Sequence, residues 1–185
     1  MKNNPTYTGC IEIICGPMFS GKTEELIRRI KRALIAKNKV VLFKPKTDNR
    51  YSESQIVSHN NNTIECITVD NTREIIEKSE QADIIGIDEI QFFDNKVINI
   101  CKTLANSGKR VIIAGLDKDY LSKSFGPISE LLAQAEYVTK LYAICMICGS
   151  YAHFTKRITN SNNQILVGET DKYEASCRSC FNLER

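Results

Sequence analysis

The feature that most constrains this chain is an eight-residue stretch near its start. The stretch consists of Gly16, Pro17, Met18, Phe19, Ser20, Gly21, Lys22 and Thr23. It matches the pattern G-x-x-x-x-G-K-[ST], in which glycines let the backbone turn tightly and direct several N–H groups at one anion. Lys22 is then placed to reach the β- and γ-phosphates of a nucleotide, and the Thr23 hydroxyl to take one position on Mg²⁺. The pattern predicts a phosphate-binding loop.

The residues on either side of this loop fit the same prediction. Residues 11–15 form a short, mostly apolar run, and residues 24–37 carry apolar side chains at helical spacing. The alternative is a chance match, which four fixed positions would give about once in a hundred chains of this length. A strand, a glycine loop and a helix in this order make chance a poor explanation, because a helix N-terminus also attracts the bound phosphate.

The rest of the chain alternates between predicted strands and helices. Strands are expected at 39–44, 82–87, 110–114 and 137–143, and helices at 73–80 with Thr72 as the cap, at 95–107 and at 127–135. A polar stretch at 46–73 contains two β-type runs, 55–58 and 63–69, with a hairpin turn at 60–62. This alternation predicts an α/β fold: a RecA-like P-loop domain over residues 10–143, whose mostly parallel sheet is flanked by helices.

Two carboxylates follow the predicted strand that ends at Ile87. A phosphate-binding loop requires an acid at the tip of a neighbouring strand, so Asp88 is expected to hold Mg²⁺. Glu89 is then a candidate base that accepts a proton from the attacking oxygen, which belongs to water in an ATPase and to a substrate hydroxyl in a kinase. A solvent-facing strand end is the alternative for the acids, and core packing is the alternative for Phe92.

Four cysteines near the C-terminus are spaced as two C-x-x-C pairs. They are Cys145, Cys148, Cys177 and Cys180, with 28 residues between the pairs. Four thiolates suit tetrahedral Zn²⁺ in a structural site, so residues 144–185 are expected to form a small zinc-ribbon-like lobe. Lys156, Arg157 and Arg178 are expected to offset the negative charge of that site. A redox pair is the alternative, although it fits one C-x-x-C pair better than two.

Composition narrows the range of partners. The chain of 185 residues has a net charge of +3, which gives no support to nucleic acid as a main partner. No apolar run approaches the 18 residues of a membrane span, and the polar N-terminus lacks a signal-peptide core. We therefore expect a cytoplasmic protein without a membrane partner, in which cysteines stay reduced.

The motifs together resemble one known family, the type II thymidine kinases of animal cytosol and bacteria. The resemblance covers the chain from Cys10 onward. It is carried by residues 16–23, 48–52, 88–93, 115–117, 125–126, 154–157 and 171–173 and by both cysteine pairs. It implies a thymidine kinase that transfers the γ-phosphoryl group of ATP to the 5′-hydroxyl of thymidine, with Mg²⁺ and a structural Zn²⁺. It also implies a homotetramer, dTTP as feedback inhibitor and acceptance of deoxyuridine.

The resemblance also implies roles for individual residues. Glu89 matches the general base, and Asp48, Arg50, Asp88 and Gln91 join the phosphate-binding loop on the ATP side. A lasso loop between the cysteine pairs would hold thymine through backbone groups of Gln164, Ile165, Leu166, Val167 and Gly168. The remaining pocket wall would consist of Met18, Phe92, Leu116, Tyr120, Phe125, Thr155 and Tyr173.

Two other function classes remain open at this point. The Asp88-Glu89-Ile90-Gln91 box also resembles that of a helicase-type ATPase, although such motors need two P-loop-type domains and this chain has one. A DNA-binding zinc ribbon would leave the phosphate-binding loop unexplained. An ATPase would hydrolyse ATP without a nucleoside, so one assay separates the first alternative from a kinase.

Overall fold

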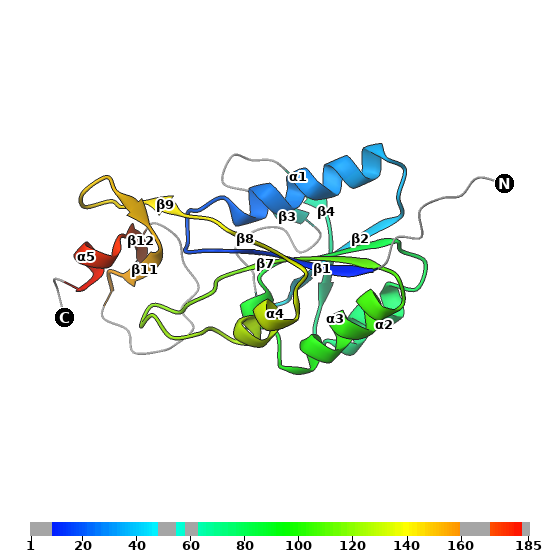
Figure 1. Ribbon diagram of the computed structural model, residues 1–185. Coiled ribbons are helices and arrows are strands. Elements are labelled where there is room, and N and C mark those ends of the chain that lie inside the picture. The colour runs from blue at the N-terminus through cyan, green and yellow to red at the C-terminus, as the bar shows by residue number, and fades with distance from the viewer. Residues whose placement is uncertain (1–8, 48–54, 58–62, 160–170, 183–185) are drawn as a thin grey trace.

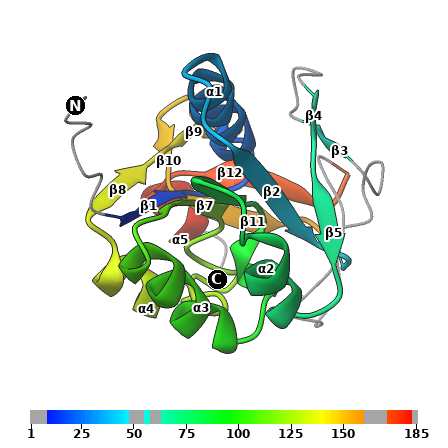
Figure 2. The same cartoon turned by 90° about the vertical axis from the view of Figure 1, so that its right-hand side faces the viewer.

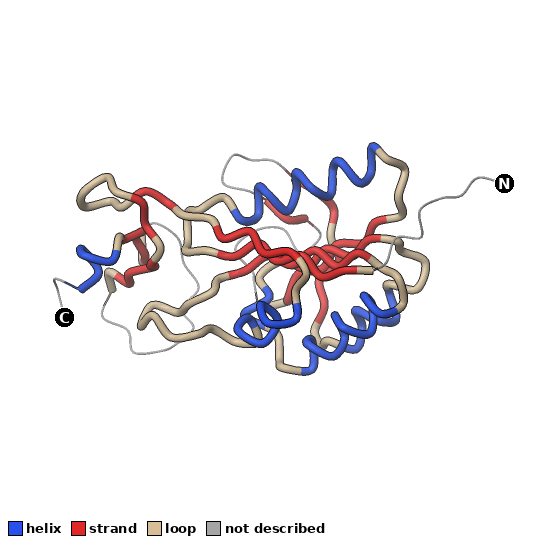
Figure 3. The backbone as a smooth tube through the Cα atoms, viewed as in Figure 1, coloured by secondary structure: helices blue, strands red, loops and turns tan. Residues whose placement is uncertain are grey.

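A parallel sheet forms the centre of the molecule (Figures 1 and 3). The structure is a computed structural model and describes residues 9–47, 55–57, 63–159 and 171–182. Within these ranges, six strands lie in the order β5-β2-β6-β7-β1-β8, and each neighbouring pair is parallel. Their bounds are β1 (Cys10–Cys15), β2 (Val40–Pro45), β5 (Ile67–Val69), β6 (Ile84–Ile87), β7 (Arg110–Gly115) and β8 (Tyr137–Lys140).

Helices cover both faces of this sheet, as Figure 2 shows. α1 (Lys22–Ile35) lies on one face, and α2 (Arg73–Lys78), α3 (Lys96–Asn106) and α4 (Ile128–Gln134) lie on the other. Successive residues of a strand point to opposite faces, so Ile13 packs in the core beside α3 and Ile14 packs in the core beside α1. Burial on both faces explains why the strands read as continuous apolar runs. The predicted α/β fold is confirmed.

The run at 63–69 is not the single element that the sequence suggests. It divides at Cys66 into β4 (Thr63–Glu65) and β5. β4 pairs antiparallel with β3 (Gln55–Val57) outside the main sheet, whereas β5 joins the sheet beside β2, so the chain must change direction between them. The antiparallel pairing expected of a hairpin is present, and the turn predicted at 60–62 lies outside the described residues.

The side chain that caps α2 belongs to Asn71 and not to Thr72 as predicted. The Thr72 hydroxyl donates to Asp94 rather than capping the helix. Asn71 takes that role, because its Oδ1 accepts hydrogen bonds from the backbone N–H groups of Arg73 and Glu74, and the Glu74 carboxylate accepts from the Asn71 N–H in return. This reciprocal arrangement is a capping box. Asn71 meets its sequence signature because Glu74 follows it three residues later.

A small lobe follows β8, which ends at Lys140 and not at residue 143 as predicted. Its elements are β9 (Ala143–Ile144), β10 (Tyr151–Ala152), β11 (Phe154–Arg157), β12 (Tyr173–Ser176) and α5 (Arg178–Asn182). β9 pairs with β10 and β11 with β12, both antiparallel. We call residues 143–159 and 171–182 the cysteine lobe and residues 9–47, 55–57 and 63–142 the α/β core. Among the described helices, none has the length and apolar character needed to cross a bilayer.

Candidate active site

The predicted phosphate-binding loop connects β1 to α1. Gly16 and Gly21 have positive φ angles of 148° and 79°, which glycine adopts without steric cost. A Cβ at Gly16 would also lie 2.5 Å from the carbonyl oxygen of Leu141. α1 begins at Lys22, two residues before the predicted start, because the N–H of Glu25 already bonds to the Gly21 carbonyl. The glycines of the motif are therefore required by the backbone path.

Side chains of the loop meet its own backbone. The Lys22 ammonium donates to the carbonyl oxygen of Pro17 at 2.6 Å, and the Ser20 hydroxyl donates to the same oxygen at 2.8 Å. Phe19 adopts a left-handed conformation with φ 63°, which is uncommon for a residue with a side chain. These two bonds curl the loop around the Pro17 carbonyl and hold the lysine side chain against the loop backbone.

The acid predicted to serve this loop lies next to it. β7 lies between β1 and β6, and the Thr23 hydroxyl donates to Oδ2 of Asp88 at 3.2 Å. The other Asp88 oxygen accepts from the Glu89 N–H at 2.9 Å, and Asp88 is only 4% exposed. Two residues 65 positions apart in sequence are therefore in contact, as the motif requires.

Glu89 follows in an unusual backbone conformation. Its φ of 51° lies in the left-handed region, and a short 3₁₀ turn, Ile90–Phe92, begins directly after it. The Gln91 amide nitrogen donates to a carboxylate oxygen of Glu89, and the Gln91 amide oxygen accepts from the Leu116 N–H at 2.9 Å. Non-glycine residues in this backbone region cost free energy and concentrate at functional sites.

The predicted pocket wall is brought together in contacting groups. Phe92 and Phe125 meet edge to face with ring centroids 5.8 Å apart, and the Met18 N–H donates to the Thr155 hydroxyl at 3.0 Å. This last bond joins the phosphate-binding loop to the cysteine lobe. Several predicted residues, namely Asp48, Arg50, Gln164, Ile165, Leu166, Val167 and Gly168, lie outside the described residues.

Arg157 contacts two further residues of the predicted wall. Its guanidinium stacks over the Tyr120 ring at 3.6 Å and donates to the Tyr173 hydroxyl at 2.8 Å. The sequence analysis gives Arg157 only a charge-balancing role, and the structure gives it these two aromatic partners as well. The burial of β11 does not alternate, since Phe154 and Thr155 are buried and Lys156 and Arg157 are half-buried, so strand periodicity does not indicate these partners.

An ion pair between a buried aspartate and an exposed lysine near the loop is a second feature that no sequence motif indicates. Asp117, two residues after the end of β7, places Oδ2 2.7 Å from the ammonium of Lys140 at the end of β8. This hydrogen bond raises the pKa of Lys140, although burial opposes it. Hydrogen bonding to an oppositely charged partner favours the charged form of the lysine. The pair fastens the ends of β7 and β8, between which β1 runs into the phosphate-binding loop.

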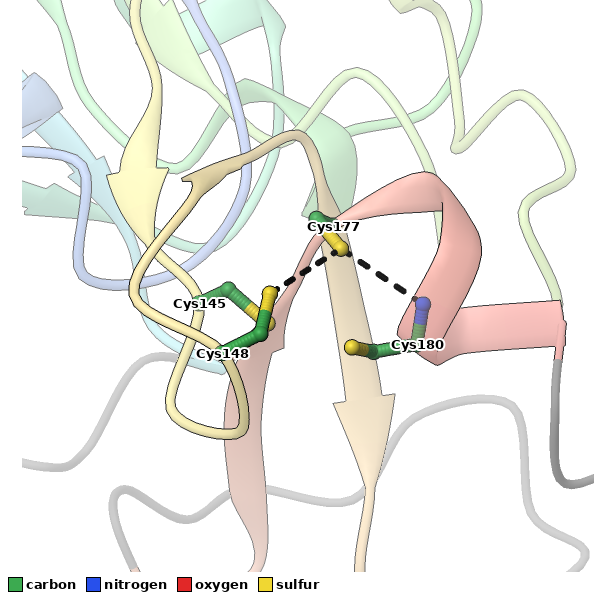
Figure 4. Close-up of side chains that lie close together, drawn as sticks. All are labelled: Cys145, Cys148, Cys177 and Cys180. Atoms are coloured by element: carbon green, nitrogen blue, oxygen red, sulfur yellow. Dashed lines mark hydrogen bonds between the residues drawn. The ribbon is translucent and has the colours of Figure 1, made fainter.

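The four cysteines of the two C-x-x-C pairs gather at one point (Figure 4). Their sulfur atoms all lie within 4.8 Å of one another, and the sulfurs of Cys148 and Cys177 are 3.6 Å apart. Tetrahedral Zn²⁺ with bonds of about 2.3 Å would place its sulfurs about 3.8 Å apart. The cluster can therefore bind a metal such as zinc, and no other group of this kind occurs among the described residues.

Hydrogen bonds within the cluster shift the pKa values of Cys145 and Cys180 in opposite directions. Burial opposes ionisation of Cys145, but backbone N–H groups of Cys177, Cys148 and Ile147 lower the pKa of that thiol to about 6. The pKa of Cys180 is raised to about 12, because hydrogen bonding with Cys148 and Cys177 retains its proton. A metal ion binds thiolates, so it would replace the proton that the cluster otherwise shares. Outside the cluster, Cys15 and Cys101 are buried in the hydrophobic core, where they pack as small side chains.

Comparison with known proteins assigns the chain to a family. A family model described as thymidine kinase matches residues 9–181. The thymidine kinase of Rhodothermus sp. (strain ITI 518) is 50% identical over 177 residues, covering 96% of this chain and 83% of the relative. That of Bacteroides fragilis (strain YCH46) is 51% identical over 173 residues, covering 94% and 87%. Among solved structures, domain III of the replication initiation protein DnaA from Thermotoga maritima aligns with a TM-score of 0.45 at 17% identity, over 75% of this chain and 56% of that one. The chain belongs to the thymidine kinase family.

Proposed function

We propose that the protein transfers the γ-phosphoryl group of ATP to the 5′-hydroxyl of thymidine. The observation that carries the reaction type is the contact between Thr23 and Asp88, with Glu89 next in the chain. Family membership makes the protein a kinase, and the relatives named thymidine kinase support thymidine as the acceptor. The conclusion joins a phosphate site in this chain to a substrate inferred from its relatives.

The ATP side of the site is formed by the loop between β1 and α1. Backbone N–H groups of the loop bind the phosphates, and Lys22 leaves the Pro17 carbonyl to reach them. Thr23 and Asp88 hold Mg²⁺, which when bound neutralises charge on the phosphates. Asp48 and Arg50 complete this side as the resemblance implies. The Thr23 hydroxyl and the Asp88 carboxylate are hard oxygen ligands of the kind that Mg²⁺ prefers.

Glu89 is the base in this proposal. Its carboxylate accepts the proton of the 5′-hydroxyl as that oxygen attacks the γ-phosphorus, and the bond between this phosphorus and the ADP oxygen breaks. Glu89 is half-buried and its N–H donates to Asp88, which supports a position close to the transferring group. The products are then dTMP and ADP.

The nucleoside binds between the loop and the cysteine lobe. Phe92 and Phe125 offer aromatic surface to the base, and Tyr120, Thr155 and Tyr173 line the lobe side. Leu116 and Met18 complete the wall. Backbone groups of the lasso, 164–168, read thymine in this proposal. Zn²⁺ on the four cysteines would hold the lobe that carries Thr155 and Tyr173 of this wall. A cytoplasmic homotetramer inhibited by dTTP stays a prediction from the resemblance.

The first test compares ATP consumption with thymidine, deoxyuridine, deoxycytidine and buffer alone. A thymidine kinase consumes ATP in the presence of thymidine and deoxyuridine and shows little consumption with buffer. A P-loop ATPase with a helicase-like box consumes ATP equally in all four. The second outcome would replace the proposed function with the alternative class.

The base is tested by Glu89→Gln. We expect both substrates to bind with unchanged Kd while kcat falls by about 10²–10⁴-fold, the usual contribution of a positioned base. Glu130→Gln, an exposed change in the first turn of α4, is the matched control and should keep full activity. A Glu89→Gln enzyme with more than a third of the original kcat would show that another group takes the proton.

A further inference from the structure

Gln91 is a buried amide with a protein partner at each end. The residue is 3% exposed, and a polar side chain so deeply buried is unfavourable unless it is hydrogen-bonded. Its amide oxygen accepts from the Leu116 N–H, and its amide nitrogen donates to the Glu89 carboxylate. The amide therefore connects the end of β7 to the proposed base.

The direction of this amide is fixed by chemistry. A backbone N–H can only donate, so the Gln91 atom that faces Leu116 must be the oxygen. The nitrogen then faces Glu89, where a carboxylate can accept its proton. The opposite orientation would leave two donors facing each other at Leu116 and two acceptors facing each other at Glu89. One backbone N–H thus determines which group is presented to the carboxylate.

Two glycines leave the space that this arrangement needs. A Cβ at Gly115 would lie 2.6 Å from the Gln91 amide oxygen and 2.6 Å from Cγ2 of Ile90. A Cβ at Gly126 would lie 2.4 Å from the Gln91 carbonyl oxygen, and Gly126 has a φ of 58°. Contacts below 3.0 Å require atoms to move. The backbone on both sides is therefore built around Gln91.

We infer that Gln91 is a positioning residue that acts on the reaction through Glu89, held by Leu116, Gly115 and Gly126. This inference rests on the proposed role of Glu89 as base. A free glutamate side chain loses rotamer entropy when it is fixed. The amide of Gln91 fixes it before substrate arrives, so the carboxylate is already oriented when the hydroxyl binds.

The same geometry offers an alternative to the role expected for Gln91. The family resemblance implies that Gln91 belongs to the residues that bind the nucleotide. In the structure both ends of its amide already have protein partners, and Gln91 is a buried residue of the 3₁₀ turn that follows Glu89. Contact with ATP is therefore not needed to explain why a glutamine occupies this position.

The test is a double-mutant cycle that combines Gln91→Met with Glu89→Gln. Methionine keeps the length and volume of the side chain but removes both hydrogen bonds. We expect Gln91→Met to lower kcat by about 10- to 100-fold, the effect of misplacing a catalytic group by about 1 Å. KM for ATP and for thymidine should stay within twofold. In the Glu89→Gln background the same change should lower kcat by less than twofold.

A second route to the same result guards against misfolding of one variant. Gly115→Ala keeps both Gln91 hydrogen-bonding atoms and displaces them through the added Cβ, so it should lower kcat in the same Glu89-dependent way. Gln134→Met, at the half-buried end of α4, is the matched control with no expected loss. The melting temperature of each variant reports on the fold independently.

Three results would overturn the inference. Equal losses of kcat with and without Glu89 would mean that Gln91 supports the fold and not the base. A raised KM for ATP at constant kcat would mean that Gln91 binds the nucleotide. Full activity of Glu89→Gln alone would overturn the base itself, and that single variant distinguishes failure of the proposed function from failure of the positioning role.

Discussion

The α/β core and the cysteine lobe bury different kinds of side chain. The core contains fully buried large residues such as Phe43, Ile85 and Ile113. The buried cluster of the lobe consists of small residues and thiols: Ala143, Cys145, Ala152, Ala175, Cys177 and Cys180. Full burial of one large aliphatic or aromatic side chain contributes about 1.5–3 kcal/mol, whereas alanine contributes far less. The lobe also buries Phe154, Tyr173 and Phe181, but the core has many more large buried side chains of this kind, so hydrophobic burial contributes far more to the core than to the lobe.

The surface of the lobe agrees with this difference. Met146 is 72% exposed and Tyr151 is 63% exposed, so part of the large apolar surface of the lobe stays in solvent, while Phe154 and Phe181 stack on each other inside it. Folding units below about 40 residues usually need a metal, a disulfide or a partner. One chain therefore depends on two main sources of stability: buried apolar surface in the core and metal ligation in the lobe.

Removal of the metal should give the largest effect. We expect Cys177→Ser, or a strong chelator, to unfold the lobe while the sheet of the core stays folded. Structural Zn²⁺ in small peptides contributes about 10–16 kcal/mol, which exceeds what the small buried cluster of the lobe can supply. Hydrogen exchange should lose protection in β11 and β12 and keep it in β1 and β7.

The control for this variant is Cys66→Ser, because Cys66 is a half-buried cysteine outside the cluster. It should keep one zinc per chain and normal protection in the lobe. If metal analysis finds no zinc in protein purified without chelator, the claim that a metal stabilises the lobe is wrong. Unchanged protection of β11 and β12 in Cys177→Ser would break it as well.

A cavity-forming substitution in the core should have a smaller effect on stability, and it should affect the core and not the lobe. Phe43 is 0% exposed in the middle of the sheet, so Phe43→Ala leaves a cavity and should lower the free energy of unfolding by about 3–5 kcal/mol. Zinc content should stay at one per chain, because the lobe does not depend on that cavity. Denaturant unfolding of the core measures the loss. Coupled loss of zinc would mean that the two regions unfold as one.

The same contrast separates what the sequence predicts well from what it does not. The core follows from periodicity, since runs such as 11–15 and 84–87 and the helix that begins at Lys22 are local patterns. The cysteine cluster follows from spacing, because two C-x-x-C pairs define their own ligand set. Local patterns thus gave both the fold and the metal site.

Contacts between distant residues could not be predicted in this way. The Asp117–Lys140 pair and the stacking of Arg157 on Tyr120 join residues whose separation in space depends on how whole elements pack. The division of 63–69 and the replacement of Thr72 by Asn71 as the cap have the same origin, because tertiary partners competed with local preferences. The orientation of the Gln91 amide likewise depends on Leu116, 25 residues away.

The bond between the two regions offers the finest test of the comparison. The Thr155 hydroxyl in the lobe accepts from the Met18 N–H of the phosphate-binding loop, and Thr155 is 5% exposed. Thr155→Val keeps the shape and leaves that N–H without its acceptor, which should cost about 1–3 kcal/mol. We expect hydrogen exchange of loop amides to depend on zinc in the original protein and to be independent of zinc in the variant.

Thr103→Val is the matched control, since Thr103 is an exposed threonine on α3 whose hydroxyl bonds only within its own helix. It should leave the exchange of the loop amides and their response to zinc unchanged. If chelation weakens protection of the loop equally in Thr155→Val and in the original protein, the lobe supports the loop through other contacts, such as Lys118 over the Phe154 ring at 4.2 Å. If chelation never affects the loop, the two regions differ in stability and also fold independently, because the hydrogen bond from the Met18 N–H to the Thr155 hydroxyl transmits nothing between them.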